Sequence, residues 1–233
     1  RDNKTVSAWL LIRGKAVPDK APELLNIITD VLTSAQLNNR TRIKQMLLEE
    51  KAGFESSLSG RGNGLAASRI GSALNAASWA NEVSGGIEYL FFLRDLIKRV
   101  DSDWPSVEAT LTRIRDILID HNSMVANVTA DPAIWTAFAP QLEAFIASLP
   151  AVPGAPLDWP VAKPKSEGLT FPGQVNFVAK GANLYTLGYT HTGATSVVQR
   201  HLNTTYMWDK VRVQGGAYGG GSGFDPFSGG FTF

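Results

Sequence analysis

The stretch WDKVRVQGGAYGG, residues 208–220, is the part of this chain from which its organisation is most readily inferred. Arg212 carries a permanent positive charge on a planar group that can grip a carboxylate with two parallel hydrogen bonds. Tyr218 adds a hydroxyl that can donate one hydrogen bond. Gly215 and Gly216, between them, would let another backbone approach closely because they have no Cβ atom. The alternative interpretation is an arginine near a helix end, followed by an ordinary glycine turn.

A helical pattern leads into this stretch and a glycine-rich strand pattern leaves it. Farther out, the same periodicities predict helices over residues 18–33, 40–58, 65–80, 87–100, 105–119, 131–149 and 192–209. Predicted strands cover residues 5–14, 124–128, 174–181, 183–190, 216–224 and 229–233. The run SGRGNG, residues 59–64, is predicted to be a flexible connection, because it lacks the lysine and the preceding strand of a phosphate-binding loop.

Residues 150–172 are so rich in proline that they cannot form a regular helix or an interior strand. They predict a semi-rigid linker between a domain over residues 1–149 and a second segment over residues 173–233. The alternation of helices and strands indicates the α+β class, with helices packed on mainly antiparallel sheets. The second segment offers too few elements for a complete domain, so we expect it to be truncated.

Composition narrows the possible partners. The chain has 233 residues, 44% of them hydrophobic, and 22 basic residues balance 21 acidic ones. This balance argues against nucleic acid or an anionic membrane as the main partner. There is no cysteine, which excludes disulfides and thiolate metal sites. No apolar run approaches the ~18–20 residues of a membrane span, and the first residue is arginine, so we expect a piece of a longer protein.

The histidines do not form a metal motif. His121, His191 and His201 are the only three in the chain, and none lies in H-x-x-E-H or H-E-x-x-H. Their spacing favours ordinary structural or surface histidines, so no metal site is expected in this chain. Neither a Ser-His-Asp arrangement nor a cysteine nucleophile has support from position.

Several stretches together resemble one protein family. TTYMWDKVRVQGGAYGG and FDPFSGGFTF, with LLIRGKAVPDKAPELLNIITDVL, RIKQMLLEEKAGFESSLSGRG, GGIEYLFFLRDL and VNFVAKGANLY upstream, are similar to the C-terminal half of the presequence proteases. These are organellar zinc metallopeptidases of the pitrilysin/insulinase type, the inverzincins. Their fold comprises four metallopeptidase-like domains (LuxS/mitochondrial processing peptidase type) around a peptide chamber. The resemblance implies that residues 1–149 are most of the third domain and 173–233 the first part of the fourth. The run GGGSGFDPFSGG is richer in glycine than the family pattern.

The resemblance also implies a function. The parent protein would be a metalloendopeptidase that degrades targeting peptides and other short unstructured peptides in the chloroplast stroma, the mitochondrial matrix or both. Zinc and its ligands would lie in the N-terminal half, the partner of this fragment, so the fragment alone is expected to be inactive. Arg212, Gly215 and Gly216 would bind substrate, and Tyr218 would donate to the substrate carbonyl oxygen as it becomes negative. The alternative is a non-catalytic scaffold or core subunit of the same fold family, which would have no need of the Arg212/Tyr218 pair.

Overall fold

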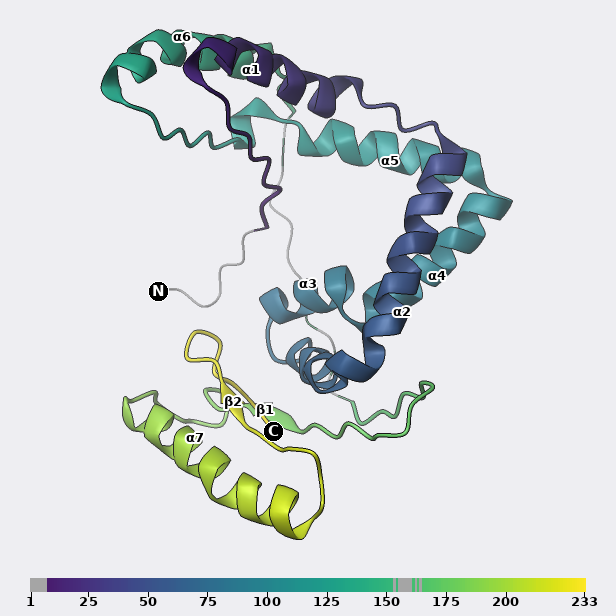
Figure 1. The fold of residues 1–233 in the computed structure, drawn as a ribbon, viewed down its shortest axis with the longest axis vertical. Coiled ribbons are helices and arrows are strands. Elements are labelled where there is room, and N and C mark those ends of the chain that lie inside the picture. The colour runs from purple at the N-terminus through teal and green to yellow at the C-terminus, as the bar shows by residue number, and fades with distance from the viewer. Residues whose placement is uncertain (1–7, 153, 155–160, 162, 164) are drawn as a thin grey trace. The chain divides into compact units, whose positions relative to one another are not determined.

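Helices dominate the chain, and a small antiparallel sheet lies near its C-terminus (Figure 1). The computed structural model describes residues 8–152, 154, 161, 163 and 165–233. In chain order the elements are η1 Pro18–Lys20, α1 Ala21–Thr29, η2 Asp30–Ser34, α2 Arg40–Gly71, α3 Ala76–Gly85, α4 Ile87–Ser102, α5 Trp104–Leu118, η3 His121–Ser123, α6 Pro132–Ser148, β1 Gly181–Asn183, α7 Ala194–Thr204, η4 Met207–Gln214, β2 Gly223–Phe224 and β3 Gly230–Thr232. The α+β class is confirmed in a mainly helical form.

The sheet has the order β1-β3-β2, and both pairs of strands are antiparallel. Gly181 of β1 lies opposite Thr232 of β3, and Phe224 of β2 lies opposite Phe231 of β3. Only the central residues of the predicted strands are paired, so the sheet is much smaller than the sequence suggested. The strand predicted over residues 216–224, for example, is reduced to its last two residues.

Two predicted strands are wrong in the part of the chain that the structure describes. Residues 8–14 of the first have no strand partner, and Trp9, Leu10 and Leu11 are 60–65% exposed; residues 5–7 lie outside the described part. Residues 124–128 also form no strand. Instead, Met124 packs against a hydrophobic cluster. Apolar and β-branched composition favours a strand only where a neighbouring strand supplies hydrogen bonds.

The loop predicted over residues 59–64 is also wrong, because α2 continues through it to Gly71. Each glycine in a helix interior costs about 1 kcal/mol relative to alanine. Contacts offset that cost: Leu65 is buried with Phe54, and the guanidinium carbon of Arg61 lies 5.4 Å from the centroid of the Phe54 ring. The ring of Phe177 lies directly over Gly62, where an added Cβ would be 2.1 Å from it. Tertiary packing therefore overrides the weak helical propensity of this run.

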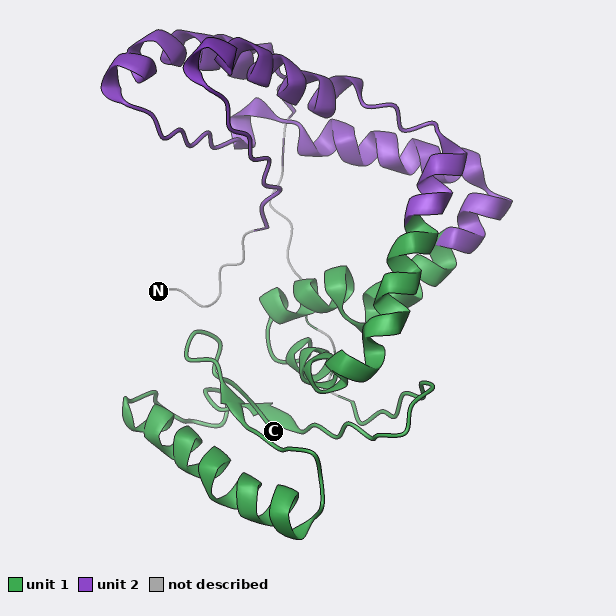
Figure 2. Ribbon diagram, viewed as in Figure 1, with its two compact units in different colours: residues 1–7, 47–96, 158–233 green, residues 8–46, 97–157 purple. Residues whose placement is uncertain are grey.

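The chain divides into two compact units (Figure 2). Unit 2 comprises residues 8–46 and 97–157, and α1 packs against α6 within it. Its hydrophobic cluster contains Leu32, Ile119 and Leu149, with Ile28, Met124 and Phe145 packed around them. Unit 1 includes residues 47–96 and 158–233, and thus contains the sheet and α7. Its cluster contains Phe54, Leu65 and Leu90, with Leu58, Ile87 and Tyr89 packed around them. The domain boundaries expected from the sequence stay a prediction.

Candidate functional site

Arg212 lies in η4, which is a π-helix and therefore has wider turns than an α-helix. Its guanidinium carbon lies 4.4 Å from the centroid of the Trp208 ring, four residues earlier. A cation above an indole face is attracted by about 0.5–1 kcal/mol at an exposed site. Because Arg212 is partly exposed, this contact orients its guanidinium and leaves donors accessible to a ligand.

Gly215 and Gly216 end this helix and turn the chain. Gly216 has φ +70°, a left-handed conformation that glycine adopts without strain. Its N–H donates to the Arg212 carbonyl at 3.0 Å, and the Ala217 N–H donates to the Val211 carbonyl at 3.2 Å. A Cβ on Gly215 would lie 2.6 Å from that same Val211 oxygen. Both glycines thus have a local conformational role, which was the alternative interpretation of the sequence.

Tyr218 follows this turn and is the most exposed aromatic side chain of the segment, at 91%. Within the described residues, no hydrogen bond of its hydroxyl is recorded, and no contact joins it to Arg212. The structure therefore presents the two predicted site residues from the same helix end and its following turn, as separate groups. A hydroxyl in this state can donate to a ligand without first breaking a bond inside the protein.

Packing beneath the turn fixes the path of residues 215–222. The Asn203 side chain of α7 accepts a hydrogen bond from the Ser222 N–H at 2.7 Å and donates to the Ser222 carbonyl at 3.1 Å. Gly220 lies against Met207, which is buried, and an added Cβ there would be 3.2 Å from its terminal methyl carbon. The segment that carries Tyr218 is therefore held at both ends by contacts to α7 and η4.

The histidines serve other purposes in the structure. Nδ1 of His121 lies 2.8 Å from the Leu149 carbonyl oxygen, and the His191 ring centroid lies 5.6 Å from that of Phe224. Across the described ranges, no three or more His, Asp and Glu side chains are grouped so as to hold a metal ion. The residues present therefore do not fit a zinc centre. No described helix is both long and apolar enough to cross a bilayer.

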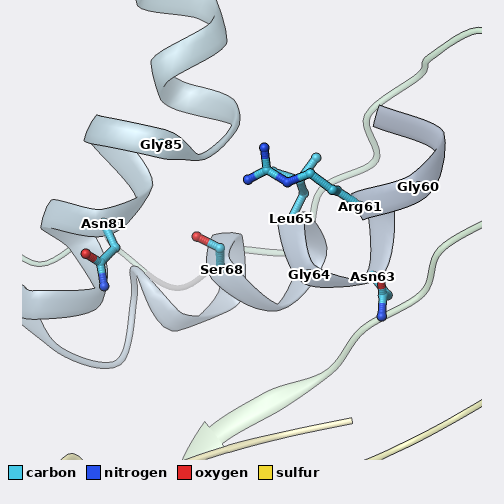
Figure 3. A pocket seen from close by; sticks show the side chains of 8 residues that line it. All are labelled: Gly60, Arg61, Asn63, Gly64, Leu65, Ser68, Asn81 and Gly85. Atoms are coloured by element: carbon cyan, nitrogen blue, oxygen red, sulfur yellow. The ribbon is translucent and has the colours of Figure 1, made fainter. Parts of the chain in front are cut away.

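A pocket of about 450 Å³ lies between α2 and α3, and sequence reasoning missed it (Figure 3). Its lining comprises Gly60, Arg61, Asn63, Gly64, Leu65, Ser68, Asn81 and Gly85. In Figure 3 the Arg61 and Asn81 side chains come from different helices, and Ser68 lies between them. The alternating glycines of residues 60–64 were the available signal, because bare helix surface leaves room for a pocket. The predicted loop at these positions concealed it.

Beside this pocket, Arg69 is the centre of a largely buried ionic network. Its side chain is only 12% exposed and pairs with three carboxylates: Glu82 at 3.4 Å, Glu88 at 2.7 Å, and Glu167. The hydrogen bond from Arg69 holds the pKa of Glu167 below its usual range, and the same bond raises the pKa of Arg69. Sequence reasoning did not find this network, because its members are spread over about one hundred residues.

Comparison with known proteins adds the family context. Residues 1–96 match a family model described as a peptidase-associated domain, and residues 166–233 match the model "PreP C-terminal domain". Presequence protease 1, chloroplastic/mitochondrial, of Arabidopsis thaliana is 38% identical over 226 residues, which is 96% of this chain and 21% of that protein. Protein HypA of Clostridium perfringens is 26% identical over 227 residues, and the mitochondrial presequence protease of Emericella nidulans is 23% identical over 240 residues. Each alignment covers 96% of this chain, and 23% and 22% of those two proteins respectively. The chain thus spans about a fifth of the length of these relatives.

Proposed function

Because this chain belongs to the presequence protease family, we propose that it forms part of a peptidase that degrades short unstructured peptides, targeting peptides among them. The observation that carries the proposal is the match of residues 166–233 to the PreP C-terminal domain model, since this segment contains both Arg212 and Tyr218. In the proposal, residues 1–149 belong to the third metallopeptidase-like domain, residues 150–172 are a linker, and residues 173–233 begin the fourth.

The proposed role of the chain is to bind and polarise the peptide. The accessible guanidinium of Arg212 would hold a carbonyl or carboxylate of the substrate in a charge-assisted fork. The hydroxyl of Tyr218, whose side chain is 91% exposed, would donate to the carbonyl oxygen as negative charge develops on it. Zinc would be held by residues outside this chain, since the described residues do not fit a metal centre.

Location and class are argued from the relatives. The printed names of several relatives place them in chloroplasts or mitochondria, and we propose the same for the protein of this chain. A non-catalytic scaffold of the same fold would have no use for an accessible tyrosine and arginine beside a braced turn. The Arg212/Tyr218 arrangement therefore favours the peptidase.

The test uses the complete protein that contains this chain, incubated with a synthetic targeting peptide. We expect cleavage that a chelator abolishes and that zinc restores. The chain alone is expected to retain no stoichiometric zinc after dialysis and to leave the peptide intact. Absence of cleavage by the complete, zinc-loaded protein would support the scaffold instead.

A further inference from the structure

Residues 167–183 lie along the C-terminal half of α2, and both segments belong to unit 1 (Figure 2). The first contact is ionic: Nε and Nη2 of Arg69 both donate to the Glu167 carboxylate. The Glu167 side chain is 24% exposed and that of Arg69 12%, so this pair is shielded from water more than an ordinary surface ion pair. The contact joins positions 98 residues apart in the sequence.

The remaining contacts depend on shape. Phe177 occupies the space over Gly62 that any other side chain would fill, and Phe171 stacks on Phe177 with ring centroids 5.9 Å apart. Farther along, Gly181 of β1 fits against Ile70, where an added Cβ would lie 2.7 Å from its Cγ2 atom. Helix α2 thus presents a bare position and a methyl group that match the segment laid against it.

The run GGIE, residues 85–88, prepares Arg69 for this contact. Glu82, only 1% exposed, accepts hydrogen bonds from the Ile87 N–H at 2.9 Å and the Glu88 N–H at 3.3 Å. Gly86 makes room for it, since an added Cβ would lie 1.9 Å from Oε2 of Glu82. The buried carboxylate caps the N-terminus of α4 and at the same time faces Nη1 of Arg69. Arg69 is thereby held in place, with Nε and Nη2 directed to Glu167.

We propose that Arg69 and Gly62 form an intramolecular docking site on α2 that holds residues 166–183 and so positions the segment bearing Arg212 and Tyr218. Arg69 and Gly62 are positioning residues, which act through the docked segment. The part of this inference that concerns catalysis rests on the proposed function. The docking itself does not.

The direct test measures a distance in this chain. Because the sequence has no cysteine, two can be introduced at the exposed positions Ala77 of α3 and Val197 of α7 and labelled with a donor and an acceptor dye. Single-molecule energy transfer should give one narrow distribution. Glu167→Gln, which removes the charge that Arg69 grips, should lower the docked fraction relative to the undocked one about tenfold or more. A second, broader population should appear as a result.

Matched controls separate docking from general damage. Lys165→Gln removes another ion pair of Glu167, 2.8 Å long, that does not involve α2, and should leave the distribution narrow. Gly62→Ala should broaden it, whereas Gly64→Ala should not, because a Cβ at Gly64 meets nothing within 4 Å. Circular dichroism should show unchanged helix content in Glu167→Gln, and a loss of helix would overturn a specific docking role. Unchanged distributions in both Glu167→Gln and Gly62→Ala would likewise overturn the proposal.

A kinetic readout connects docking to the site. In the complete peptidase, substrate that binds only the docked state would draw the segment back, so Glu167→Gln should raise KM while kcat at saturation is largely retained. A fall in kcat with unchanged KM would overturn the positioning role. If the complete protein cleaves no peptide at all, the proposed function fails, while the distance measurement still decides whether docking occurs.

Discussion

Tyr218 and Tyr206 offer a comparison at the residue scale, because both are exposed tyrosines of the same segment, at 91% and 58%. Tyr218→Phe removes one hydroxyl and almost no volume. If that hydroxyl donates to a developing oxyanion, kcat of the complete peptidase should fall by about 10²–10³ with normal zinc content and normal melting. Tyr206→Phe should leave kcat unchanged. Equal kcat values for the two variants would assign Tyr218 a packing role.

Arg212 should behave differently from Tyr218, because its grip on a peptide exists before the reaction begins. Arg212→Ala removes a charged hydrogen bond worth about 1.5–3 kcal/mol, so KM should rise roughly tenfold or more, together with a loss in kcat. Arg200→Ala in α7, an exposed arginine, is the control and should leave both constants unchanged. Steady-state kinetics on one short peptide decides, and an unaltered KM in Arg212→Ala would contradict substrate binding.

At the scale of elements, adjacent glycines between α3 and α4 should respond in opposite directions. Gly86→Ala places a Cβ 1.9 Å from the buried Glu82 carboxylate, whereas at Gly85 nothing lies within 4 Å. We expect Gly86→Ala to lower the free energy of unfolding by about 1–3 kcal/mol through overpacking. Gly85→Ala should raise it by up to about 1 kcal/mol, because alanine favours the helix end. Urea unfolding measures both, and equal changes would show that Glu82 adapts freely.

The sequence predicted those elements whose signals are local. The helices α5 and α6 begin as expected, because Asp103 accepts a hydrogen bond from the Ser106 N–H and Pro132 lies in the first turn of α6. Strands depend on partners distant in the chain, and therefore residues 8–14 were assigned wrongly. The helical path of residues 60–64 depends on Phe177, more than one hundred positions away, which no periodicity can reveal.

The candidate site divides in the same way. Arg212 and Tyr218 were named from one short stretch and a family pattern, and the structure adds that both are accessible while leaving their roles as a proposal. Arg69 could not be named from the sequence, because an arginine in a helix is usually a solvated charge. Only the fold brings Glu82, Glu88 and Glu167 to it.

At the scale of the whole molecule, carboxylates of both units should make stability depend on acidity. A hydrogen bond from Lys44 lowers the pKa of Asp101, the Val152 N–H lowers the pKa of Asp120, and Arg69 lowers the pKa of Glu167. Their native pKa values lie below those of the unfolded chain. Such groups stabilise the fold above their ordinary pKa, near 4, and that contribution is lost as pH falls through the native values.

We therefore expect Tm to be nearly constant from about pH 7 to pH 5 and to decrease steadily below about pH 4. Glu167→Gln should lower Tm at neutral pH and weaken its dependence on pH below 4, because one of the titrating groups has gone. Calorimetry across this range provides the measurement. A Tm that stays level down to about pH 3 would contradict the assignment of these carboxylates.

The proline-rich segment is fastened on either side, and this makes it a tether of fixed length. Before it, the Val152 N–H donates to Asp120 at 2.9 Å; after it, Glu167 is gripped by Arg69. Twelve residues lie between Val152 and Lys165, a stretch of chain that can span at most about 45 Å. A leash this short keeps its free end at an effective concentration on the order of millimolar. Were the contact at Arg69 to break, residues 166–183 would rebind as an intramolecular reaction, at a rate independent of how dilute the protein is.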